Sequence, residues 1–135
     1  MKKTLTLLIC LICYQILCHA QVADEHYYFK NLSVQNGLSQ NTVNTILQDK
    51  QGFMWFGTKD GLNRYDGLSF RKFKHDDRSQ RSIGNNFITA LYEDEKGSIW
   101  VGTDVGLYIY YPEKDSFEHF TKQSVENTRI EHTVT

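Results

Sequence analysis

The same pattern of apolar and polar positions occurs twice along this chain. The segment from Gly52 to Gly67 (GFMWFGTKDGLNRYDG) returns 45 residues later as the segment from Gly97 to Pro112 (GSIWVGTDVGLYIYYP). Nine positions of residues 41–65 are identical in residues 86–110, namely Asn41, Asp49, Gly52, Trp55, Gly57, Thr58, Gly61, Leu62 and Tyr65. A repeat of about 45 residues is typical of one four-stranded β-propeller blade. The pattern therefore predicts an all-β fold with antiparallel blades over residues 41–74 and 86–121.

Each copy predicts four strands joined by tight turns. Residues 53–58, like their counterparts in the second copy, are rich in aromatic and β-branched side chains, as strands are. Residues 49–52 begin with Asp and end with Gly, which favours a turn. Residues 41–49 place apolar side chains at helical spacing, but the segment is short and β-branched. We interpret it as the innermost strand of the blade, packed on both faces.

Trp55 and Trp100 occupy the same position of the two copies. An indole buries about 150–250 Å² of surface in a core. At about 25 cal/mol per Å², this burial contributes at most about 4–6 kcal/mol. The many aromatic residues also suggest stacking on a sugar ligand, so exposed, ligand-facing indoles are the alternative. We expect both indoles to be buried between neighbouring blades.

The repeat array begins and ends with partial elements. Phe29 and Leu32 are three residues apart, like Phe70 and Phe73 at the end of the first copy, and they predict an outer strand without a blade of its own within residues 21–40. Residues 75–85 are polar and predict a connector between the blades.

The last residues of the chain resemble the opening of a further copy. His132 to Thr135 match the opening strand of the second copy, so residues 122–135 are predicted to be a connector and the start of a third blade. A propeller closes with roughly 4–8 blades. We therefore expect an incomplete ring and a fragment of a longer protein; a ring completed by other chains is the alternative.

Residues 1–20 have the pattern of an export signal. Two lysines precede an apolar run over residues 5–17, and Cys18-His19-Ala20 forms a small-x-small cleavage site. The run is shorter than the roughly 20 residues of a spanning helix, so we expect cleavage after Ala20 and a periplasmic location; a retained anchor is the alternative. All three cysteines, Cys10, Cys13 and Cys18, lie in this segment. The exported chain is therefore predicted to lack disulfides, thiolate zinc ligands and thiol nucleophiles.

Charge is nearly balanced along the chain. Lys and Arg number 15 against 16 Asp and Glu, and no basic block is present. A nucleic-acid-binding domain normally carries a basic patch or stripe. Nucleic acid is therefore not expected as a partner.

Few residues have the spacing of catalytic or metal-binding groups. The histidines of the exported chain are far apart, and we interpret them as surface or packing residues, namely His26, His75, His119 and His132. Asp49 and Asp94 are equivalent in the two repeats and point alike, whereas paired catalytic carboxylates face one another. We interpret both as turn residues. No catalytic, cofactor-binding or metal-binding residue is expected.

Four polar residues distinguish the first copy from the second. They are Asp60, Asn63, Arg64 and Asp66, where the second copy has Val105, Tyr108, Ile109 and Tyr111. This difference is consistent with a ligand-facing patch or with ordinary divergence of loops. The residues that contact a ligand remain unknown at this point.

The repeated residues resemble the two-component regulator propeller family. Its repeats share an inner strand ending in Asp, a Gly turn, a W-x-G-T strand and a G-L-x-x-Y/F strand, which the first copy matches from Asp49 to Tyr65 and the second from Asp94 to Tyr110. The resemblance covers residues 28–135. It implies the exported N-terminal sensor region of a hybrid two-component system, in which propellers precede a membrane helix and a histidine kinase.

The resemblance also implies a function without chemistry in this chain. Many members of the family sense oligosaccharides. The resemblance therefore implies a periplasmic sensor with an oligosaccharide ligand, no cofactor, and a kinase in a longer parent anchored in the inner membrane. Its partners would be the remaining blades and domains of that parent, and a homodimer of the parent is a further possibility. The alternatives are a fragment of an exported propeller lyase or hydrolase acting on polysaccharide, and a protein-binding scaffold.

Overall fold

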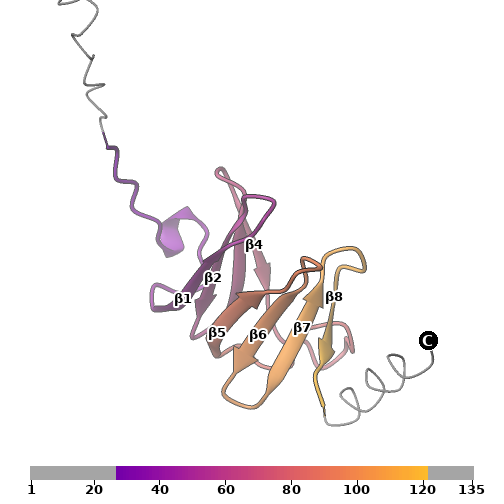
Figure 1. Ribbon diagram of the computed structural model, residues 1–135. Helices are drawn as coiled ribbons and strands as arrows, with labels where there is room; N and C mark the ends of the chain where they lie inside the picture. Colours follow the sequence, from indigo (N-terminus) through magenta and orange to yellow (C-terminus); the bar gives the residue numbers. More distant parts are fainter. Residues whose placement is uncertain (1–26, 122–135) are drawn as a thin grey trace, which may run out of the picture. The chain divides into compact units, whose positions relative to one another are not determined.

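The computed structural model describes residues 27–121 (Figure 1). The predicted signal peptide, the connector after residue 121 and the predicted start of a third blade lie outside the described residues. The elements are the 3-10 helix η1 (Val34–Asn36) and the strands β1 (Val43–Gln48), β2 (Met54–Thr58), β3 (Gly61–Tyr65), β4 (Phe70–Phe73), β5 (Ile88–Glu93), β6 (Ile99–Thr103), β7 (Leu107–Tyr111) and β8 (Ser116–His119).

The strands form two antiparallel sheets of identical topology. One sheet has the order β1-β2-β3-β4 and the other β5-β6-β7-β8, and the two lie side by side in Figure 1. Even the irregularities repeat, because the register shifts between Val43 and Thr45 in the first sheet and between Ile88 and Ala90 in the second. The prediction of two four-stranded antiparallel blades is confirmed.

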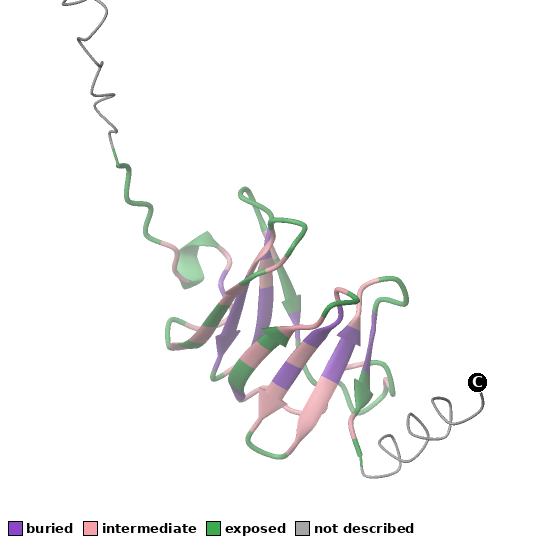
Figure 2. Ribbon diagram, in the orientation of Figure 1, coloured by how far each residue is buried: buried purple, intermediate pink, exposed green. Residues whose placement is uncertain are grey.

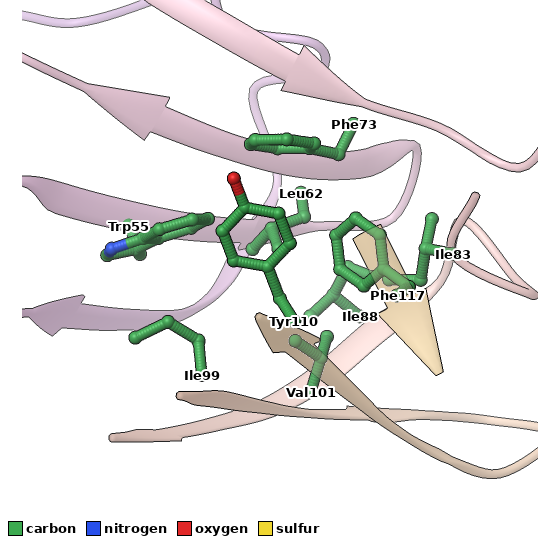
Figure 3. Packing of buried hydrophobic residues seen from close by; sticks show 9 residues of the cluster. All are labelled: Trp55, Leu62, Phe73, Ile83, Ile88, Ile99, Val101, Tyr110 and Phe117. Carbon is green, nitrogen blue, oxygen red and sulfur yellow. The ribbon is translucent and has the colours of Figure 1, made fainter. Parts of the chain in front are cut away.

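The larger hydrophobic core lies between the two sheets. Figure 3 shows Trp55 and Phe73 of the first blade beside Tyr110 and Phe117 of the second. Trp55 stacks on Phe73 at 5.7 Å between ring centroids and meets Tyr110 edge-on at 5.5 Å. Aromatic pairs in these geometries contribute about 0.5–1.5 kcal/mol beyond their buried area. The interface between blades is thus an aromatic core.

A second, smaller core covers the other face of the first blade. It contains Leu38, Phe56 and Tyr65, with Phe70 packed against them. The segment after η1 contributes Leu38, which is buried. Gly37 ends η1 with φ of 109°, a left-handed conformation suited to glycine, and so turns the chain toward the sheet.

The two repeated tryptophans differ in burial. Trp55 is only 1% exposed, whereas Trp100 is half-buried and contacts Phe120 at 4.9 Å. Trp55 faces the second blade, while Trp100 points from the opposite face of that blade, where no third sheet is present among residues 27–121. The expectation of two equally buried indoles is therefore met at Trp55 and not at Trp100 in this structure.

We predicted that the innermost strands are packed on both faces. The structure shows that they are not. In β1 the half-buried and exposed positions alternate strictly. Ile46 is 58% exposed and Tyr92 63% exposed. Each lies on a sheet face that carries no further sheet in the described part of the chain. In Figure 2 the buried residues are concentrated in the middle strands of the sheets and not in the innermost strands.

The predicted outer strand at Phe29–Leu32 is also not formed. Residues 27–33 have no regular secondary structure. A strand needs a neighbour for its backbone hydrogen bonds, and each sheet of residues 27–121 contains only its own four strands.

Candidate functional site

The a–b turn of each blade, between its first and second strands, is held by the repeated aspartate. Asp49 Oδ1 accepts hydrogen bonds from the amides of Gln51 (3.0 Å) and Phe53 (2.9 Å), and its Oδ2 accepts one from Trp55 Nε1 (2.7 Å). The carboxylate therefore shapes the turn and also satisfies the buried indole N–H. Asp49 is fully engaged in structure, as its interpretation as a turn residue requires.

Asp94 repeats this arrangement in the second blade. It accepts hydrogen bonds from the amides of Lys96 and Ser98, both at 2.9 Å, and from Trp100 Nε1 at 3.1 Å. Burial raises the pKa of Asp94, but the bonds from Trp100, Ser98 and Lys96 outweigh this effect, so the net pKa is lowered. Its charged form is the one that the turn stabilises.

Gly57 allows the two inner strands to approach. A Cβ atom at Gly57 would lie 2.6 Å from Cγ2 of both Thr45 and Ile88. Close by, Asn44 Nδ2 donates a hydrogen bond of 2.8 Å to the Ile88 carbonyl oxygen. The W-x-G-T motif therefore encodes contact between blades as well as strand formation.

The residues that distinguish the first copy have local partners and do not form one patch. Asp60 pairs with Lys74 at 2.7 Å, at the start of β3. Asp66, after the end of β3, accepts hydrogen bonds from Ser69 and Leu68, which lower its pKa, the Ser69 amide most of all. The two carboxylates thus lie at opposite ends of one strand.

Asn63 fastens the N-terminal segment to the first blade. Its side chain is fully buried, and Oδ1 accepts a hydrogen bond of 2.9 Å from the Ser39 amide while Nδ2 donates to Ser39 Oγ at 2.8 Å. Nδ2 also lies 3.2 Å from the Phe56 carbonyl oxygen. A buried amide with these partners serves the fold and is not accessible to a ligand.

Arg64 lies on the face of the first blade that packs against the second blade, directly opposite Trp55. Its guanidinium lies over the ring of Phe53, 4.5 Å from the centroid, and 5.7 Å from that of Trp55. On the adjacent strand its direct neighbour is Arg71. Arg64 thus presents a charged group on the side of the first blade that meets the second blade.

An ionic network joins the blades beside Arg64. Arg71 Nη2 lies 2.7 and 2.6 Å from the two carboxylate oxygens of Asp115, and the Tyr110 hydroxyl donates to Asp115 at 2.8 Å. The bond to Arg71, followed by that from Tyr110, lowers the pKa of Asp115. Burial, followed by the Asp115 bond, raises the pKa of Tyr110 to about 12. Tyr110 is therefore a neutral donor at physiological pH.

Sequence reasoning missed this network. A charge difference between the two copies could have revealed it. In the first blade Arg71 lies directly opposite Arg64. At the equivalent positions of the second blade, Glu118 lies opposite Ile109. Asp115 has φ of 48° and so adopts a left-handed conformation that Asp tolerates better than most residues. Neither feature belongs to the repeated motif.

A lysine joins the a–b turns of the two blades. Lys50 Nζ donates to the carbonyl oxygens of Asp94 (2.7 Å) and Glu95 (3.2 Å), and the Lys50 amide donates to Glu93 Oε2 (2.9 Å). The second copy has Glu95 at the position of Lys50. The contact is therefore directional, from the first blade to the second.

The two described histidines lie in different surroundings. In the connector between blades, His75 Nδ1 lies 2.9 Å from the Ile83 carbonyl oxygen and Nε2 lies 2.8 Å from Asp77 Oδ1. The Asp77 bond, followed by the Ile83 bond, raises the pKa of His75. His119 stacks on Tyr108 at 4.8 Å. His26 and His132 lie outside the described residues.

The residues that the structure describes, 27–121, lack two kinds of functional feature. Within them no three His, Cys, Asp or Glu side chains gather in a way that could hold a metal ion. Over the same residues, no helix has the length and apolar character needed to cross a bilayer.

The chain is similar to proteins named as parts of signalling systems. The sequence is 40% identical over 60 residues to Histidine kinase P4 of Formosa agariphila, an alignment covering 44% of this chain and 4% of that protein. The structure is similar to the extracellular domain of a protein of B. thetaiotaomicron assigned to hybrid two-component systems, with a TM-score of 0.65 and 38% identity, covering 71% of this chain and 14% of the other. A second extracellular domain from that organism, assigned to a one-component system, matches with a TM-score of 0.56 and 27% identity over 77% of this chain and 14% of the other.

Sheet topology, repeat length and packing between the sheets define the class: these are blades of a β-propeller. The profile of the family "Two component regulator propeller" matches residues 37–60 and 82–105, one segment in each copy. Both copies of the repeat are thus similar to this family in the segments where their sequence motifs predict it. The chain spans only a small part of the length of each relative.

Proposed function

We propose that this chain is the start of a periplasmic, ligand-sensing propeller that passes a signal to a histidine kinase in a longer parent protein. The observation that carries the proposal is the match to an extracellular domain assigned to a hybrid two-component system, at 38% identity over 71% of this chain. The similarity to a histidine kinase points the same way.

The contacts of the repeated residues support a binding role without chemistry. The repeated Asp, Trp and Gly residues are used in turns and in packing between blades. A ligand therefore has access to the loops and to non-repeated side chains rather than to the motif itself. We propose an oligosaccharide as the ligand class, and this part of the proposal rests on the resemblance alone.

The test uses the complete parent protein and its exported region. We expect calorimetry against a panel of oligosaccharides to detect one that binds, and the same sugar to induce a reporter placed behind the parent's target promoter. Cleavage of a polysaccharide by the purified exported region, with neither binding nor induction, would replace the sensor by a propeller enzyme. A parent variant with its phospho-accepting histidine changed should bind the sugar and give no induction.

A further inference from the structure

Two arginines lie directly opposite each other on the face of the first blade that packs against the second blade. Arg64 on β3 and Arg71 on β4 are paired residues of the same sheet, so their side chains leave the same face. Like charges in directly opposite positions destabilise a sheet. The second blade has Ile109 and Glu118 at these positions, so the propeller fold does not require two cations there.

Both guanidinium groups are held in place by aromatic rings. Arg64 lies 4.5 Å from the centroid of Phe53, and Arg71 lies 4.7 Å from that of Phe73. Stacking on aromatic rings is a preferred arrangement of arginine, and it fixes the plane in which the N–H donors point. The donors are therefore oriented before any ligand arrives.

The donors of the pair exceed the acceptors around them. Arg71 uses a single terminal nitrogen for Asp115. Arg64 makes no hydrogen bond or ion pair with the described residues; its contacts there are the rings of Phe53 and Trp55. Asp115 supplies one negative charge against two positive ones. The two arginines thus share Asp115 as a counter-charge, and Arg64 keeps planar N–H donors that no described residue fills.

We propose that Arg64 and Arg71 bind an anionic group of a small-molecule ligand: a carboxylate, a phosphate or a sulfate. Arg64 binds it through paired N–H donors, which match the geometry of such oxyanions. Arg71 adds its remaining donors while keeping Asp115. The site lies on blade surfaces that the family motif does not specify, and it is independent of the sensor role.

The test measures how different anions change the thermal stability of the complete protein that carries these repeats. Melting temperatures are compared in sodium sulfate, phosphate and acetate and in sodium chloride of equal ionic strength. Sulfate and phosphate also stabilise proteins without binding a site, so the decisive quantity is the difference between variants. Arg64→Ile places the second repeat's own residue in the first blade, and Arg78→Gln removes an exposed arginine of the connector as the matched control.

We expect at least one of the three anions to stabilise wild type and Arg78→Gln equally. Arg64→Ile should weaken the apparent affinity for that anion about tenfold or more, the loss expected for hydrogen bonds to a charged group. Arg64→Lys keeps the charge without the planar fork and should also bind less tightly than wild type. The three anions distinguish the oxyanion class.

Equal anion responses in wild type, Arg64→Ile and Arg78→Gln would overturn the site. Equal affinity of Arg64→Lys and wild type would overturn the paired-donor geometry. Because the readout is anion binding and not signalling, this proposal can fail while the sensor proposal stands, and the reverse also holds.

Discussion

At the residue scale, the aspartate before each a–b turn has two structural roles, of which the sequence predicts only the role in the turn. Asp49 and Asp94 close the turn and also accept the indole hydrogen of the repeated tryptophan. In the first blade this tryptophan, Trp55, packs between the two blades. Local turn chemistry and packing between blades are therefore connected through a single carboxylate.

Asp49→Ala is expected to destabilise the complete protein by about 2–3 kcal/mol. The change leaves the indole N–H of Trp55, which is only 1% exposed, without its acceptor. Urea denaturation provides the measurement. Asp104→Ala is the control, because Asp104 is exposed in a turn of the second blade, and its loss should change stability by less than about 0.5 kcal/mol. Equal effects of the two changes would contradict this role of Asp49.

Gly57→Ala is expected to cost about 1–3 kcal/mol by overpacking. The new methyl group would lie 2.6 Å from Cγ2 of Ile88. A double-mutant cycle with Ile88→Ala checks the cause, since removing that methyl group relieves the contact with Ile88 and leaves the equally close one with Cγ2 of Thr45. The double variant should be more stable than the sum of the two single effects predicts. Simple additivity would show that the strain lies elsewhere.

At the element scale, the blades are joined by polar contacts at the ends of strands as well as by the aromatic core. The Arg71–Asp115 pair is such a contact, and the connector between the blades has a local contact of its own between His75 and Asp77. Both contain groups whose pKa is shifted in the folded state. The two contacts should therefore respond to pH in opposite directions.

Asp115 should stabilise the interface at neutral pH and lose this effect in acid. Its folded pKa is lowered, so its contribution is present above the unfolded pKa of about 3.9 and is lost as pH falls through the folded value. Wild type should therefore lose more stability than Asp115→Asn between about pH 5 and pH 3. Asparagine also tolerates the left-handed backbone of this position. Parallel pH dependences of the two melting temperatures would argue against the ion pair.

The connector should be most stable when His75 is protonated. Both ring nitrogens face oxygen acceptors, so the imidazolium makes both hydrogen bonds. Because its folded pKa is raised, the contribution is complete below the unfolded pKa of about 6.5 and is lost as pH rises through the folded value. Amides of residues 76–83 should gain protection from hydrogen exchange at pH 6 relative to pH 8, after correction for intrinsic rates. In His75→Gln this pH dependence should vanish.

At the scale of the whole molecule, two blades leave apolar surface uncovered. Ile46, Leu68 and Tyr92 are 58%, 91% and 63% exposed, and Trp100 is half-buried. Repeat arrays need about three or more units to bury their faces.

We expect residues 21–135, expressed alone, to aggregate or to unfold without cooperativity. Size-exclusion chromatography and thermal melting of that polypeptide provide the measurement. The matched comparison is the complete protein, which should melt cooperatively. A monomer of residues 21–135 with a sharp transition would contradict this expectation.

The sequence predicts the repeated part of the molecule well, and the reason is physical. Asp49, Trp55 and Gly57 have roles set by turns, strand packing and close approach, and those roles recur with the same spacing in the second copy. The exposure of Ile46 and Trp100 depends on neighbours that are absent from the described sheets. The Arg71–Asp115 contact joins non-repeated residues of different blades, so no periodicity reveals it.

The lysine that joins the two a–b turns gives the array a direction. Lys50 donates to backbone oxygens of the following blade, and its counterpart Glu95 has no N–H donor on its side chain. If the two blades were exchanged in a synthetic gene, a carboxylate would take the place of the lysine at this junction. The two blades share one fold but are not interchangeable, because the side chains at their junction, such as Lys50, suit only the observed order of the blades.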